Sequence, residues 1–129
     1  MNGCTDSLSS VNIEKKLVII GGGPAGHAAA TSAARLGAEV VLIERDIIGG
    51  AAHLLDCVPS KTMISTGAAM KFTDNLSGMG LESRNANVDV EALTARIEGI
   101  KTKLSNDVTS MLENQGVLIL RGTASLVDQ

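Results

Sequence analysis

The chain has 129 residues, a net charge of −3, and a composition that is 44% hydrophobic and 19% charged. This length allows one modest core, and the hydrophobic content excludes a disordered chain. The negative charge and the near absence of aromatic residues (Phe72 alone) argue against nucleic-acid binding, which needs a basic surface and stacking side chains.

Targeting, membrane and metal signals are missing from the sequence. No apolar run reaches the length of a membrane span, and segment 1–12 lacks the basic and apolar regions of a signal peptide. Cys4 and Cys57 do not make a disulfide framework, and His27 and His53 have no partners at metal-ligand spacing. We therefore expect a cytosolic protein without a metal site.

The predicted elements alternate between strand and helix. A polar, disordered tail (1–14) precedes a strand at 17–20, a helix at 25–36 that ends at Gly37, and a strand at 39–43. A loop at 46–56 leads to a helix that Pro59 opens and that runs to about residue 72. After a connection at 75–87, the 90–114 segment has helical periodicity, and a third strand follows at 117–120. The apolar stripe of the 90–114 helix is expected at Leu93, Ile97, Ile100, Leu104, Val108 and Met111.

This alternation predicts a Rossmann-like, doubly wound parallel α/β sheet with the 39–43 strand in the middle. Parallel sheets are normally covered on both faces. The chain supplies only part of that cover, so we expect it to be truncated and its free sheet edge to be prone to association.

A Gly-rich fingerprint follows the first strand, in Lys16-Leu-Val-Ile-Ile-Gly-Gly-Gly-Pro-Ala-Gly26. Gly21 permits the tight turn, and Gly23 lets the backbone approach a pyrophosphate. Gly26 lets the helix pack closely on the strand, while Pro24 and Ala25 form its first turn, where free N–H groups attract phosphate. The motif predicts an adenine dinucleotide as ligand.

An acidic residue, Glu44, ends the second strand about twenty residues beyond the glycines, where the fingerprint expects the acceptor for ribose hydroxyls. A carboxylate there disfavours a 2′-phosphate, so NADP is not expected at this site. The fingerprint alone does not separate FAD from NAD. Arg45 either contacts the adenosine or is solvated.

A second motif, Gly49-Gly-Ala-Ala-His-Leu-Leu-Asp-Cys-Val-Pro-Ser-Lys61, resembles the active-site segment of the flavoprotein disulfide reductases, the pyridine nucleotide-disulfide oxidoreductases of dihydrolipoamide dehydrogenase type. Their segment reads Gly-Gly-Thr-Cys, four residues, then Cys-Ile/Val-Pro-Ser-Lys. The resemblance extends from Lys16 to Asp128. It implies that residues 15–129 are the N-terminal part of an FAD-binding domain, without the NAD(P)H and dimerisation domains. It further implies FAD as cofactor, NAD(P)H as electron donor and a homodimeric parent.

The resemblance also implies roles for particular residues. Cys57 would lie beside the flavin, at a helix N-terminus that favours a thiolate. Lys61, one turn later on the same helix face, would stabilise negative charge on the reduced flavin. Read alone, these are an inert thiol and a solvated lysine. Backbone groups of the remaining candidates would contact the pyrophosphate (Gly49, Gly50, Ala51) and the adenine (Thr123, Ala124).

One position departs from the family pattern. The first redox cysteine should stand at position 52, where this chain has Ala52, and dithiol–disulfide exchange requires two sulfurs. The Gly-Gly-Ala-Ala sequence resembles family members that are NAD(P)H:quinone reductases, in which the flavin reduces a quinone without a thiol relay.

Three functions therefore remain open. The first is a segment of a quinone reductase, inactive by itself because no second fingerprint supplies a nicotinamide site. The second is a segment of a dihydrolipoamide dehydrogenase-like disulfide reductase, and the third is a non-catalytic flavin-binding module.

Overall fold

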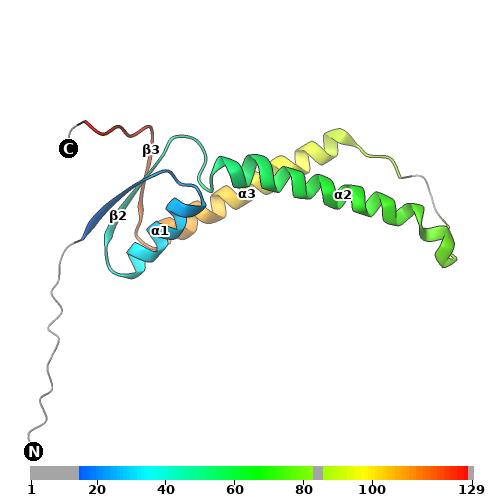
Figure 1. Ribbon diagram of the computed structural model, residues 1–129, viewed down its shortest axis with the longest axis horizontal. Coiled ribbons are helices and arrows are strands. Elements are labelled where there is room, and N and C mark those ends of the chain that lie inside the picture. Colours follow the sequence, from blue (N-terminus) through cyan, green and yellow to red (C-terminus); the bar gives the residue numbers. More distant parts are fainter. Residues whose placement is uncertain (1–14, 83–85, 128–129) are drawn as a thin grey trace, which may run out of the picture.

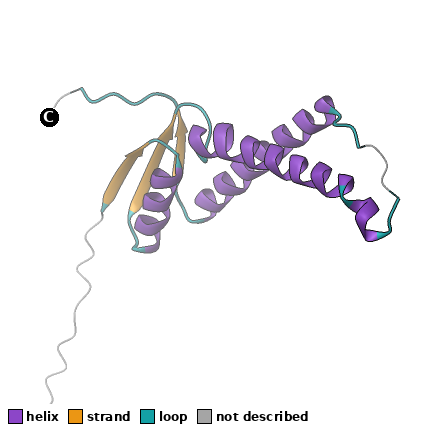
Figure 2. Cartoon of the chain, turned by 45° about the vertical axis from the view of Figure 1, so that its right-hand side comes forward, coloured by secondary structure: helices purple, strands orange, loops and turns teal. Residues whose placement is uncertain are grey.

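The computed structural model describes residues 15–82 and 86–127; the expected tail at 1–14 lies outside them. Three strands, β1 (Lys16–Ile20), β2 (Glu39–Glu44) and β3 (Leu118–Arg121), form a parallel sheet in the order β1-β2-β3 (Figure 2). In the register, Ile43 of β2 pairs with Ile20 on one side and Leu120 on the other. The predicted α/β fold class and the central place of the second strand are confirmed.

One helix covers the sheet, and the other two project away from it for most of their length. Helix α1 (Pro24–Arg35) packs on β1 and β2. A π-helical turn (Ala52–Cys57) continues into α2 (Val58–Asp74), and a 3₁₀ turn (Leu76–Met79) precedes α3 (Val90–Asn114). Helices α2 and α3 form a long hairpin that projects from the sheet, with the C-terminal end of α3 returning to it (Figure 1).

Local signals fix the helix ends. Gly37, with a φ of +81°, ends α1: its N–H donates to the Ala34 oxygen and that of Ala38 to the Ala33 oxygen, a Schellman motif. At the start of α3, the Asp89 carboxylate accepts from the Ala92 N–H at 2.9 Å.

The core lies between one face of the sheet, α1 and the last turns of α3. Its buried members come from all of these elements and from the loop after β2: Ala30, Val40, Leu42, Ile48, Leu112 and Val117. The predicted α3 stripe is wrong at its end, because Leu112 is fully buried whereas Met111 is 37% exposed. The other five stripe residues are half-buried, and α3 contacts α2, α1, β3 and the π-helical turn.

The opposite face of the sheet has little cover. Val18 and Ile20 of β1 are each 59% exposed, and Leu118 and Leu120 of β3 are 56% and 46% exposed. The parallel register places these side chains in rows with Val41 and Ile43 of β2, since paired residues of adjacent strands point to the same face. The expectation of partial cover is thus confirmed. Within the described ranges, no helix is long and apolar enough to cross a bilayer.

Candidate functional site

A pocket of about 300 Å³ opens where the carboxyl ends of the three strands meet, which is where open parallel sheets bind their ligands. The structure brings five of the predicted ligand-binding residues together here. The lining consists of Ile20, Gly21, Ile43, Glu44, Arg45, Gly122, Thr123 and Ala124. Ile20, Ile43 and Gly122 were not predicted from the sequence as pocket residues. Each stands at or just after the carboxyl end of a strand, and that position could have indicated it.

The turn between β1 and α1 needs its glycines for different reasons. Gly21 has a φ of +101°, which L side chains rarely adopt. A Cβ at Gly26 would overlap with the carbonyl oxygen of Gly21, so the helix can approach the turn only without one. At Gly23, by contrast, a Cβ would meet no protein atom nearer than 3.8 Å, that atom being the Cα of Gly50. Protein packing therefore does not explain Gly23.

The N-terminus of α1 has no side-chain cap. The N–H of His27 donates to the Gly23 oxygen at 2.9 Å, and the N–H groups of Ala25 and Gly26 precede this first intrahelical bond. Pro24 occupies the first helical turn and has no N–H to satisfy. The donors of Ala25 and Gly26, together with the positive end of the helix dipole, have the chemistry that suits an anion.

The Glu44 carboxylate is held by main-chain donors. Its Oε2 accepts from the Gly22 N–H at 2.6 Å, and its Oε1 accepts from the Asp46 N–H at 2.7 Å. The Asp46 bond lowers the pKa of Glu44 below its usual value of 4.5; partial burial opposes this shift, and the Gly22 bond adds to it. Glu44 is thus an anionic acceptor at the mouth of the pocket.

Two arginines stand near Glu44. The Arg45 side chain is exposed and forms an ion pair with the Asp46 carboxylate, 3.1 Å from Nε to Oδ2. Arg121 donates from Nη1 to the Asp46 main-chain oxygen at 3.3 Å. Arg45 therefore lines the pocket while its guanidinium is engaged on Asp46.

The loop after β2 differs from expectation. Gly49 and Gly50 have positive φ values of +107° and +85°, but their N–H groups donate within the protein, to the Gly22 oxygen at 2.9 Å and to the Ile47 oxygen at 3.1 Å. These two amides are therefore not presented to a pyrophosphate. Ala51 begins a continuous helical stretch that ends at Asp74.

Cys57 and Lys61 lie on that helical stretch and do not line the strand-end pocket. Cys57 is a half-buried free thiol. Cys57 is the N-cap residue of α2, as expected, but the π-helical turn runs into α2 here, so the continuous helical stretch already begins at Ala51. Lys61 is exposed one turn further on.

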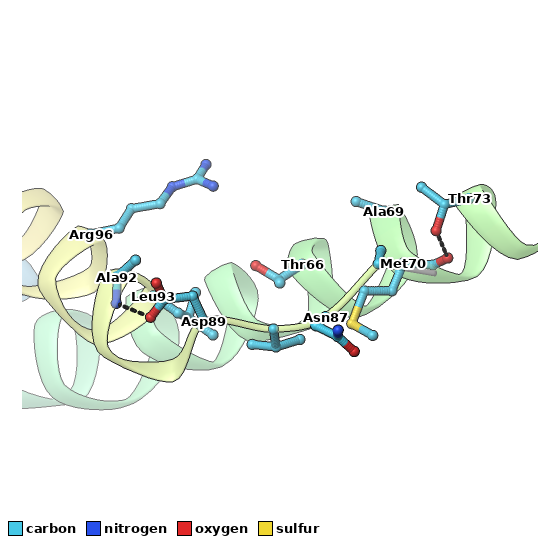
Figure 3. Close-up of a pocket in the computed structure, with 11 residues that line it drawn as sticks. Thr66, Ala69, Met70, Thr73, Asn87, Asp89, Ala92, Leu93 and Arg96 are labelled. Atoms are coloured by element: carbon cyan, nitrogen blue, oxygen red, sulfur yellow. Dashed lines mark hydrogen bonds between the residues drawn. The ribbon is translucent and has the colours of Figure 1, made fainter. Parts of the chain in front are cut away.

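Two other pockets contain few or none of the predicted residues. One of about 210 Å³ is lined by His27 and His53 together with Pro24, Gly49 and apolar side chains. The other, about 340 Å³, lies between Thr66 and Met70 of α2 and the start of α3 (Figure 3). Among residues 15–82 and 86–127, no three His, Cys, Asp or Glu side chains are grouped as a metal site would need.

The sheet, the Gly-rich turn and the strand-end pocket define a Rossmann-like α/β nucleotide-binding fold. Comparison with known proteins gives the family. Residues 15–129 match the pyridine nucleotide-disulphide oxidoreductase family, and the chain belongs to it.

Individual relatives carry different enzyme names. A dihydrolipoyl dehydrogenase of Haloarcula marismortui is 36% identical over 121 residues, which are 94% of this chain and 25% of that protein. An NAD(P)H dehydrogenase (quinone) of Mycobacterium tuberculosis is 40% identical over 119 residues, 88% of this chain and 24% of that protein. The crystal structure of LpdA from M. tuberculosis superposes with a TM-score of 0.81 at 35% identity, over 88% of this chain and 25% of that one. The chain spans about a quarter of the length of the curated relatives it matches.

Proposed function

We propose that this chain forms the adenosine and pyrophosphate part of an FAD site in an NAD(P)H-dependent flavin oxidoreductase. The observation that carries the proposal is the strand-end pocket, where Gly21, Glu44 and Thr123 meet beside the uncapped N-terminus of α1. The pocket offers an anionic acceptor for sugar hydroxyls, and the helix end offers amide donors for phosphates.

The residues present fit such a ligand. Protein packing does not require glycine at Gly23, where a Cβ would meet the Gly50 Cα at 3.8 Å, and the missing side chain would let a pyrophosphate approach the first turn of α1. The Glu44 carboxylate has acceptor capacity beyond its two main-chain bonds, because an ionised carboxylate has about four lone-pair sites. Thr123 and Ala124, after β3, would flank the adenine on the side opposite Gly21.

The flavin would supply the redox chemistry when bound. This chain's part is to hold the dinucleotide, and Lys61 would place a cation near the negative charge of the reduced flavin. We assign turnover to a complete oxidoreductase, because the relatives are much longer than this chain.

Within the family, we favour the quinone reductase type. Cys57 has no sulfur partner at position 52, where the chain has alanine, so a thiol relay between these positions cannot operate. The 40% identity to the M. tuberculosis NAD(P)H dehydrogenase (quinone) supports this choice. The alternative is a dihydrolipoyl dehydrogenase type, supported by the Haloarcula relative. Robust lipoamide turnover by a complete protein that contains this segment would favour the alternative.

The proposed ligand is tested by titrating the 129-residue chain with FAD and following flavin fluorescence. The informative variant is Gly23→Ala, because its Cβ meets no protein atom closer than 3.8 Å and the φ of −70° suits alanine. The matched control is Gly67→Ala on α2, where a Cβ would meet nothing within 4 Å.

We expect Gly23→Ala to keep the fold and to weaken FAD binding by roughly tenfold, an effect of about 1.4 kcal/mol. Gly67→Ala should bind as the wild type does. Equal affinities for all three chains, or no binding by the wild type, would rule out the proposed site.

A further inference from the structure

Glu44 joins the turns that follow all three strands. Its carboxylate accepts from Gly22 in the turn after β1 and from Asp46 in the loop after β2, at 2.6 and 2.7 Å. Its main-chain oxygen accepts from the Gly122 N–H, after β3, at 2.9 Å. One residue at the end of the central strand therefore connects every segment that builds the pocket.

The two side-chain bonds require a carboxylate. Both partners are N–H donors, so both side-chain atoms must be acceptors, which glutamate provides and glutamine does not. Hydrogen bonds to an ionised acceptor are roughly twice as strong as neutral ones. A residue needed only to accept from sugar hydroxyls would not have to engage both oxygens on the protein's own backbone.

Packing fixes the same turn from the other side. A Cβ at Gly22 would lie 2.9 Å from Cδ1 of the fully buried Ile48 and 3.2 Å from the Glu44 Cβ. Gly22 is itself buried, and its carbonyl oxygen accepts from the Gly49 N–H. The peptide that leads into Gly23 and the first turn of α1 is therefore held between Glu44 and the loop after β2.

We propose that the Glu44 carboxylate is a positioning group, which holds the Gly-rich turn in its phosphate-binding shape before any ligand arrives, in addition to any contact with the sugar. Its consequence for affinity rests on the proposed function, since it requires a nucleotide to bind at this turn. The hold on Gly22 and Asp46 does not depend on a ligand.

The first test measures amide hydrogen exchange by NMR on the 129-residue chain without ligand. The variant is Glu44→Gln, and the control is Glu39→Gln, which makes the same charge change on the same strand at an exposed ion pair with Lys16. We expect the Gly22 and Asp46 amides to be protected in the wild type and in Glu39→Gln. In Glu44→Gln, at least one of the two should exchange roughly tenfold faster. Unchanged exchange in Glu44→Gln, or unfolded-like exchange of Gly22 in the wild type, would overturn the proposal.

A second measurement needs no variant. The proton shift of the Gly22 amide should follow the titration of the Glu44 carboxylate, with a midpoint below 4.5, because the lowered pKa of Glu44 belongs to the hydrogen-bonded state. A Gly22 shift that is flat through this acid range would contradict the proposed contact, even if Glu44→Gln failed to fold.

The third test separates positioning from sugar binding. ADP and 2′,3′-dideoxy-ADP carry the same diphosphate, but only ADP has ribose hydroxyls. We expect Glu44→Gln to weaken both, by roughly three- to tenfold, with Glu39→Gln unchanged. A penalty for ADP alone would show that Glu44 acts only through the hydroxyls. If the wild type bound neither nucleotide, the proposed function would fail, and the exchange and titration results would still decide the role of Glu44.

Discussion

Gly50 lies against Gly23 so closely that a Cβ at Gly50 would be 2.7 Å from the Gly23 Cα. The same Cβ would lie 3.0 Å from Cδ of Pro24. The loop after β2 therefore packs directly on the turn that begins α1, and no room remains there for a side chain at position 50.

The first prediction concerns this contact. Gly50→Ala should destabilise the fold by about 1–3 kcal/mol, because it overpacks the contact and places alanine at a φ of +85°. Urea denaturation measures the change, with Gly67→Ala as the control. A Gly50→Ala chain as stable as the wild type would show that the two loops do not pack as described.

The second prediction concerns the end of α3. Leu112→Ala should cost about 2–5 kcal/mol, the usual range for a buried leucine, since Leu112 has no exposed surface. Met111→Ala, one position earlier and 37% exposed, should cost clearly less. Chemical denaturation of both variants measures the loss of unfolding free energy. A larger loss for Met111→Ala than for Leu112→Ala would show that Met111 is the residue that packs in the core.

The third prediction concerns pH. Because the pKa of Glu44 is lower in the folded chain than its usual value of 4.5, the ionised carboxylate stabilises the fold above that value. This contribution is lost as the pH falls through the lowered pKa. The difference in unfolding free energy between wild type and Glu44→Gln should therefore shrink below pH 4.5. Denaturation curves at several acid pH values measure it, and a constant difference would argue against the linkage.

The fourth prediction concerns the poorly covered sheet face. Val18→Thr combined with Leu118→Thr should reduce self-association with little loss of stability, because these side chains are 59% and 56% exposed. Ile64→Thr on α2, where the side chain is 70% exposed, removes apolar surface elsewhere and is the control. Sedimentation velocity measures the association. Equal association of both variants would show that this face is not responsible.

The sequence predicted the strands and α3 well because each had a local signal. The α3 bounds of 90–114 matched, since Asp89 caps one end and Gly116, with a φ of +80°, ends the other. The turn at Gly21 was equally predictable, because its conformation admits almost no other residue.

Features that depend on tertiary partners were not predictable. Pro59 predicted a helix start, and α2 begins at Val58 with the proline in its first turn. The π-helical turn at Ala52–Cys57 that leads into α2 lies in the segment expected to be a loop. Likewise, the periodicity predicted the apolar side of α3 but not the elements that this side packs against, so the burial of Leu112 was not predicted. The Gly49 N–H donates to the oxygen of Gly22, in the turn after β1, and a one-dimensional pattern does not reveal such a distant acceptor.

Ile20 and Ile43 line the strand-end pocket and also belong to the rows on the poorly covered face of the sheet. A polypeptide that bound over those rows would also line the pocket. The affinity of the chain for that polypeptide and its affinity for the proposed nucleotide would then be linked, and binding of one would change the affinity for the other by the same factor.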